Sequence, residues 1–174
     1  MFNFEFSSIL EKHDSSLGWF YVVFVPEQFI IEFGDEKSPR VKALFNQKHE
    51  SHISVKCRNE ERYIVINKTI RKKLNLQLGD LVDIKLEKEV SEYGMPMPEE
   101  LDEMLAQEQK ARKYFQALTP GKQRTLIYLV SNLKSSDARI RKSLGIVEHL
   151  SEYEGELDFK LLNEKFKAVN IRFK

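Results

Sequence analysis

One short stretch, Gly94-Met95-Pro96-Met97-Pro98, divides this chain into two parts of different character. A glycine and two prolines so close together are incompatible with a regular helix or strand. Before the stretch, apolar residues alternate with polar ones or form short β-branched and aromatic runs, whereas after it they recur at helical spacing. The sequence therefore predicts an α+β protein with a strand-rich part (1–93), a Pro/Gly linker (94–98) and a helical part.

Six short strands are expected before the linker. Phe2, Phe4 and Phe6 alternate with polar residues, which is the period of a half-buried strand. Pro26 and Ser38-Pro39-Arg40 act as turn signals between the apolar runs. Many short strands with turns between them are typical of a small barrel. The expected strands lie near residues 2–6, 17–25, 41–45, 53–55, 63–66 and 81–86.

A weak internal repeat supports the barrel. Val25-Pro26-Glu27-Gln28-Phe29-Ile30 leads to Gly34-Asp35, and Ile66-Asn67-Lys68-Thr69-Ile70-Arg71 leads to Gly79-Asp80. In each copy, glycine supplies a positive φ and aspartate can bond back to the turn backbone. Coincidence is the alternative, but two such halves would close a barrel without exposed edges. We expect a small closed six-stranded barrel, AbrB-like or double-psi-like, completed within one chain.

The part after the linker is expected to form a bundle of three to four helices, with a helical segment over 99–155 and a C-terminal helical tail over 156–174. Acidic residues over 99–103 suit the N-terminus of the first helix, where the macrodipole favours negative charge. Thr119-Pro120 begins a further helix. Ser135 or Ser136 caps the next one.

Composition excludes several classes of protein. The 174 residues are 41% apolar and 32% charged with a net charge of +1, which is a globular composition without a strong overall field. A lone cysteine, Cys57, fits a reducing compartment. The first residues lack the pattern of a signal peptide, and the longest apolar stretch, 19–25, is too short to span a bilayer. We expect a cytoplasmic protein without membrane insertion.

No catalytic constellation is recognisable, so we expect neither an enzyme nor a cofactor. The spacing of His49, His52 and Cys57 is compatible with a metal, but these residues lie in an expected polar hairpin without an evident fourth ligand. His13 lies in an expected turn with no nucleophile assigned to it. Gly121-Lys122 lacks the earlier glycine of a phosphate-binding loop.

Charge distribution is the most informative feature of the sequence. Residues 110–142 contain nine lysines and arginines and one acid, between acidic stretches at 99–108 and 148–158. Helices that meet at 134–137 can present guanidinium groups and backbone N–H groups to an anion. The alternative is a solvated helical face with salt bridges to the acidic flanks. The candidate anion-binding residues are Arg124, Lys134, Arg139, Arg141 and Lys142.

These basic residues flank the apolar stripe of their helix, so we expect that Arg139, Arg141 and Lys142 do not all point into solvent. Arg139 and Lys142 are three residues apart and share a helical face. If Arg139 serves structure, its partner is expected to be an acid of the first helix, Glu100 or Glu103. If it serves binding, its head is expected to face a pocket with Lys134 or Arg124 nearby.

Several ordered motifs resemble known families. Residues 1–93 resemble a β-barrel domain of unknown function through Trp19, Pro26, Val65-Ile66-Asn67-Lys68 and Leu78-Gly79-Asp80. Residues 96–155 resemble the YdeI/OmpD-associated segment, called the bacteriocin-protection family. The residues that carry this second resemblance are Pro98-Glu99-Glu100-Leu101, Phe115, Leu118-Thr119-Pro120, Arg124, Lys134, Arg139 and Arg141-Lys142. That family often has threonine where this chain has Ala138, so a contact made by that hydroxyl is expected to be missing.

The resemblance implies a non-catalytic binding protein, loosely linked to protection against bacteriocins or peptide antibiotics, with an unknown anionic ligand or protein partner. Residues 66–80 also resemble the barrel half of AbrB-type and MazE-type transcription factors, where this element serves a DNA-binding dimer. The alternative is therefore a DNA-binding regulator that uses residues 68–73 or the basic helix 137–150. An enzyme with an unrecognised site is the third hypothesis.

Overall fold

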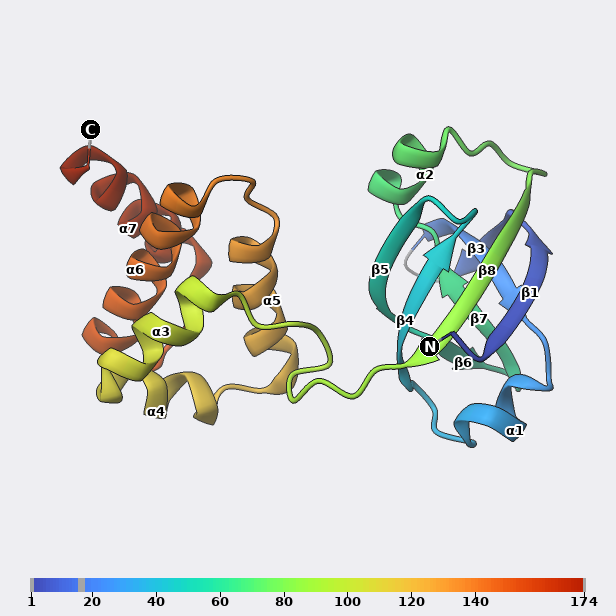
Figure 1. The fold of residues 1–174 in the computed structure, drawn as a ribbon, viewed down its shortest axis with the longest axis horizontal. Helices are drawn as coiled ribbons and strands as arrows, with labels where there is room; N and C mark the ends of the chain where they lie inside the picture. The colour runs from blue at the N-terminus through green and yellow to red at the C-terminus, as the bar shows by residue number, and fades with distance from the viewer. Residues whose placement is uncertain (1, 16–17, 174) are drawn as a thin grey trace. The chain divides into compact units, whose positions relative to one another are not determined.

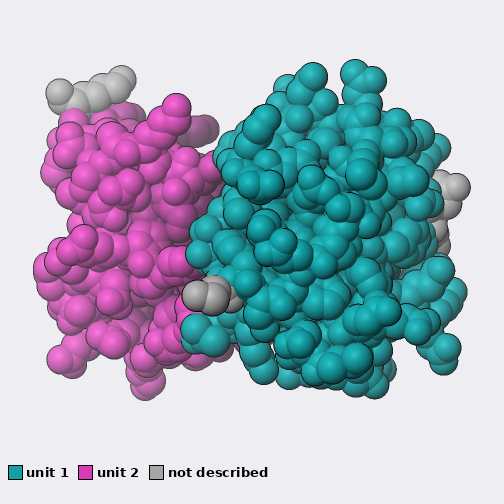
Figure 2. Space-filling model, turned by 45° about the vertical axis from the view of Figure 1, so that its right-hand side comes forward, with its two compact units in different colours: residues 1–90 teal, residues 91–174 magenta. Residues whose placement is uncertain are grey.

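The computed structural model describes residues 2–15 and 18–173, without the side chains of residues 14–19. The expectations placed on Leu17 and on the Trp19 side chain lie outside the described residues. The chain forms two compact units, residues 1–90 (unit 1) and residues 91–174 (unit 2), which Figure 1 draws as a ribbon and Figure 2 in two colours. Unit 1 is mainly strands and unit 2 is helical, so the protein is α+β.

Unit 1 contains two four-stranded antiparallel sheets, with strand orders β1-β8-β4-β5 and β2-β3-β7-β6. Alternation directs one face of each strand inward, as in β4, where Val41, Ala43 and Phe45 are buried between polar neighbours. The strands are β1 (Phe4–Ile9), β2 (Glu11–Ser15), β3 (Gly18–Val25), β4 (Arg40–Phe45), β5 (His49–Ser54), β6 (Lys56–Arg58), β7 (Glu61–Val65) and β8 (Leu81–Lys88).

The expected closed six-stranded barrel, AbrB-like or double-psi-like, is wrong. Among the described residues, β1, β5, β2 and β6 are edge strands with one hydrogen-bonded neighbour each, so both sheets are open. A strand of one sheet continues directly into a strand of the other at two corners, Leu10 and Val55, whose side chains are fully buried. Strands that bend around their own core and continue in a second sheet are typical of packed sheets that meet at an angle.

Loops, rather than neighbouring strands, satisfy the backbone at these corners. The Leu10 N–H donates to the Asp80 carbonyl at 2.8 Å, and the Gly79 N–H donates to the Leu10 carbonyl at 2.9 Å. The Val55 N–H donates to the Pro39 carbonyl at 3.1 Å. Because the segments before β8 and β4 occupy the corner backbone groups, no ladder closes across them.

Two strands, β2 and β6, were absent from the sequence prediction. Their sequences, Glu11-Lys12-His13-Asp14-Ser15 and Lys56-Cys57-Arg58, are mostly polar, so no apolar alternation marks them. They form because they extend β1 and β5 beyond the corners and pair with β3 and β7. Their signal is therefore tertiary and not local.

The internal repeat is present in the topology. One half contains β3, α1 (Phe29–Phe33) and β4, and the other contains β7, α2 (Lys68–Leu74) and β8. If each strand of β1–β4 is exchanged with its counterpart in β5–β8 (β1 with β5, and so on), each sheet keeps the same strand order, read from its other edge. Gly34 and Gly79 have φ of 81° and 89°, as predicted. The Asp80 carboxylate accepts the Gln77 N–H at 2.7 Å, whereas its counterpart Asp35 pairs with Arg62.

The described residues of unit 2, 91–173, form five helices, more than the three to four expected. They are α3 (Glu99–Gln107), α4 (Gln109–Ala117), α5 (Pro120–Ser131), α6 (Ser136–Glu152) and α7 (Phe159–Arg172). The extra helix arises because the expected first helix breaks at Glu108, with φ −112° and ψ 86°. A continuous helix would bring the polar Glu108 and Arg112 onto the face of Leu105; the break instead buries Ala111 and Phe115.

Helix α6 is the centre of unit 2 and packs against each of the other four helices (Figure 1). It begins after Ser135, whose hydroxyl accepts the Ala138 N–H at 3.3 Å, so the predicted cap at Ser135 or Ser136 is confirmed and lies at Ser135. Within the described part of the chain, none of the helices has the length and apolar character needed to cross a membrane.

Candidate functional site

Helix α6 carries three of the five predicted site residues, and it turns them toward different neighbours. Arg139, Arg141 and Lys142 are all partly buried, which confirms that they do not all point into solvent. Arg139 contacts α3, whereas Arg141 and Lys142 contact residues of α7. One sequence cluster is therefore divided between two sides of the helix.

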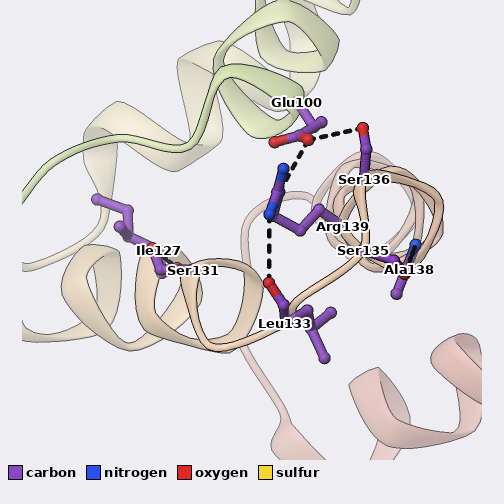
Figure 3. A network of polar contacts seen from close by, with 8 residues as sticks. All are labelled: Glu100, Ile127, Ser131, Leu133, Ser135, Ser136, Ala138 and Arg139. Carbon is purple, nitrogen blue, oxygen red and sulfur yellow. Dashed lines mark hydrogen bonds and ion pairs between the residues drawn. The ribbon is translucent and has the colours of Figure 1, made fainter.

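Arg139 is held in a network of three hydrogen bonds, two of its own and one between its neighbours (Figure 3). Its Nε donates to Glu100 Oε1 at 2.8 Å, and its Nη1 donates to the Leu133 carbonyl at 3.3 Å. The Ser136 hydroxyl donates to the same Glu100 oxygen at 2.8 Å. The backbone N–H of Glu100, then Ser136 and Arg139, hold the pKa of Glu100 below its usual range. Glu100 is thus the structural partner that the sequence predicted for Arg139.

A shallow pocket of about 320 Å³ lies beside this network. It is lined by two acids, Glu99 and Glu100, and by one cation, Arg139, which is already paired. Arg124 and Lys134 are not among its lining residues, so the arrangement expected for a binding role of Arg139 is not formed. An anion would bind weakly in this pocket, because the carboxylates of its lining repel it.

The second pocket of unit 2, which we call the α6–α7 pocket, has a volume of about 140 Å³. Its lining contains two cations and no acid. The Lys142 Nζ lies 3.7 Å from the centroid of the Phe166 ring, and Arg141 Nε donates to Asn170 Oδ1 at 3.2 Å. Burial lowers the pKa of Lys142 below its usual value. The lining residues are Leu133, Ala138, Arg141, Lys142, Phe166 and Asn170.

The structure thus brings together two of the five predicted residues in a pocket suited to an anion. The sequence grouped Lys142 with Arg139, yet Lys142 lies beside Arg141. Neighbours on a helix are about 100° apart, and long side chains can span that angle when an aromatic ring attracts the ammonium. Arg124 is half-buried on α5, Lys134 is exposed in the α5–α6 turn, and neither lines the α6–α7 pocket.

Sequence reasoning missed the pocket residues contributed by α7. No functional role was predicted for Phe166 or for Asn170, one helical turn further on. Their i, i+4 spacing places them on one face, but nothing local says that this face meets Arg141. Ala138, the position where a hydroxyl contact was expected to be missing, lines the pocket with its methyl group.

Unit 1 has a larger hollow of about 700 Å³ with the opposite chemistry. Its lining includes three acids, Glu27, Asp35 and Glu60, and one cation, Arg62, which pairs with Asp35. It therefore disfavours an anion. Among residues 2–15 and 18–173, no three His, Cys, Asp or Glu side chains are arranged to hold a metal.

Comparison with known families gives two adjoining matches. Residues 94–153 match the family described as bacteriocin-protection, YdeI or OmpD-associated. Residues 6–86 match a domain of unknown function, DUF1905. No curated protein matches the chain. The first match includes all five predicted site residues but ends before α7, which supplies Phe166 and Asn170.

Proposed function

We propose that this chain, in which a DUF1905 match precedes a match to the bacteriocin-protection, YdeI or OmpD-associated family, is a non-catalytic, cytoplasmic binding protein for an anionic ligand. The name of the family links the segment to bacteriocin protection. In this proposal the ligand binds in the α6–α7 pocket, and Arg141 and Lys142 hold it.

The observation that carries this proposal is the environment of Lys142. Its ammonium lies over the Phe166 ring, and no carboxylate of the described residues pairs with it. Removing a cation from water costs free energy unless an opposite charge compensates. A bound anion supplies that charge, and the second cation of the pocket, Arg141, adds to the attraction.

Nuclear magnetic resonance tests the proposal on the full chain. We expect sodium acetate or sodium phosphate, titrated at constant ionic strength against sodium chloride, to shift the backbone amides of Ala138, Lys142 and Asn170 saturably. Lys142→Met keeps the aliphatic stem over Phe166 and should abolish the shifts. Lys134→Met is the matched control, because Lys134 belongs to the same sequence cluster but lines neither the α6–α7 pocket nor the pocket beside Arg139. Linear, non-saturating shifts, or equal losses in both variants, would overturn the proposal.

DNA binding is the alternative, and α2 is the element that favours it. Lys68, Lys72 and Lys73 are exposed on this helix, while the Arg71 guanidinium lies 3.8 Å from the centroid of the Tyr21 ring. Phosphate contacts weaken steeply between about 50 and 200 mM salt. A salt-dependent gel shift of duplex DNA that Lys72→Glu abolishes and Lys142→Met leaves intact would favour this alternative.

A further inference from the structure

We propose that the α6–α7 pocket recognises a carboxylate attached to an apolar group, as at the end of a peptide or in a small free acid. This inference rests on the proposed anion-binding function and names the chemical class of its ligand. Two properties of the lining carry it: the polar groups that remain free there are donors, and the rest of the lining is apolar.

The first property follows from the hydrogen bond between Arg141 and Asn170. Arg141 Nε donates to Asn170 Oδ1, so the amide oxygen already has a donor and faces Arg141, and the Nδ2 group is left as a donor. The Nη groups of Arg141 and the Nζ of Lys142 have no acceptor among the described residues, and neither nitrogen group can accept. A ligand that satisfies these groups must present acceptors only, which a carboxylate or another oxyanion does.

The second property separates a carboxylate from a phosphate. Leu133, Ala138 and Phe166 form the apolar half of the lining. A carboxylate carries its two oxygens on one side and apolar carbon on the other, so both halves of the lining find a complement. A phosphate has oxygens on every side, and those facing the apolar half would lose hydration without gaining donors.

Volume limits how much of the ligand enters. The pocket holds about 140 Å³, which suits a carboxylate and its nearest apolar carbons better than a large cofactor. The remainder of a longer ligand would lie outside the pocket. The Ala138 N–H is already capped by the Ser135 hydroxyl, so recognition depends on side chains and not on the N-terminus of α6.

Calorimetry with four small probes tests the inference: N-acetylvaline, N-acetylvalinamide, sodium acetate and inorganic phosphate. We expect N-acetylvaline to bind at least about tenfold more tightly than its amide, because the amide brings no negative charge to two partly buried cations and adds N–H donors among groups that are themselves donors. It should also bind more tightly than acetate, which lacks the apolar group, and than phosphate. If phosphate binds as tightly as N-acetylvaline, this inference fails and the proposed anion binding stands. If no probe binds, both fail.

Two variants locate the binding. Lys142→Met should lower the affinity for N-acetylvaline by at least about tenfold. Ala138→Leu should fill the pocket without changing its charge. Ala138→Leu with an unchanged Tm and unchanged affinity would overturn the inference; if this variant does not fold, Lys142→Met decides. A pentapeptide ending in valine, with a free or an amidated C-terminus, distinguishes the two sources: binding of the free form alone indicates a peptide end, and binding of neither indicates a small acid.

Discussion

Two sides of the same helix show how neighbouring basic residues acquire different roles. On one side of α6, Arg139 pairs with Glu100 at 2.8 Å and ties α3 to the α5–α6 turn. On the other side, Lys142 lies over an aromatic ring, and Arg141 meets an amide. The difference lies in what the facing helix offers: α3 presents an acid, and α7 presents Phe166 and Asn170.

This contrast teaches that a cluster of positive charge is not one functional unit. A paired arginine donates its N–H groups to acceptors of the protein itself, and the pair holds the helices in place. An unpaired, partly buried cation keeps its attraction for an external anion. Each prediction below breaks or sharpens this distinction, and they run from the largest expected effect to the smallest.

Reversing the charge of Arg139 should have the largest effect on stability. In Arg139→Glu, the new carboxylate faces Glu100 and the Leu133 carbonyl loses its donor. We expect Tm of unit 2 to fall by about 5 °C or more, as measured by thermal denaturation. Lys134→Glu, at an exposed position of the same cluster, is the control and should leave Tm nearly unchanged. Equal Tm values for Arg139→Glu and the native chain would mean that Arg139 is only a solvated charge.

Gly145→Ala should disturb the packing between α6 and α7, on the side of α6 that carries Lys142. A Cβ at this position would lie 2.6 Å from Phe166 Cδ1, in a helix interface where both residues are buried. Overpacking lowers the free energy of unfolding by about 1–3 kcal/mol, and the better helix propensity of alanine offsets up to about 1 kcal/mol of this loss. We expect a net loss of about 1 kcal/mol in the free energy of unfolding and displaced Lys142 resonances.

Gly121→Ala is the matched control for that substitution. A Cβ at Gly121 in α5 meets nothing within 4 Å, so alanine should be neutral or stabilising there. If both substitutions had the same effect, the close approach of α7 to α6 at Gly145 would not matter for stability.

His149, a fully buried histidine of α6, should make the stability of the protein depend on pH. Burial is the chief cause that lowers the pKa of His149. Its folded-state pKa is therefore below the unfolded value of about 6.5, so its stabilising contribution is present above that value and is lost as pH falls toward the folded pKa. We expect Tm to fall more steeply between about pH 7 and 5 in the native chain than in His149→Leu. Parallel Tm profiles would contradict this expectation.

Lys142→Met should have the smallest effect on stability. The substitution removes a partly desolvated charge that has no carboxylate partner and keeps a long apolar stem against Phe166. We expect the free energy of unfolding to change by less than about 0.5 kcal/mol, as measured by urea denaturation. A loss as large as that of Arg139→Glu would remove the distinction between the two sides of α6.

The fold was predictable where local patterns carried it. The Pro/Gly stretch, the positive φ of Gly34 and Gly79, and the cap at Ser135 were all visible in the sequence, because each depends on the conformational limits of nearby residues. The open sheets were not visible, since closure depends on whether edge strands meet across the corners at Leu10 and Val55. Local alternation is the same in an open and a closed sheet.

The candidate site divides in the same way. The basic cluster and the acid that could pair with Arg139 were identified from charge and helical phase. The α6–α7 pocket was not, because two of its six lining residues, Phe166 and Asn170, come from α7, far along the chain from Arg141. Side chains that are distant in sequence meet only when helices pack, and periodicity does not specify which faces will meet.

By itself, then, the sequence determined the division at residues 94–98, the helical and strand-rich characters of the two parts, and the inventory of charges. Only the tertiary structure decided that two sheets stay open and that Arg139 is neutralised while Lys142 is not. The physical reason is range: propensity, capping and turn chemistry act over a few residues, whereas desolvation and pairing depend on which distant side chain occupies the facing surface.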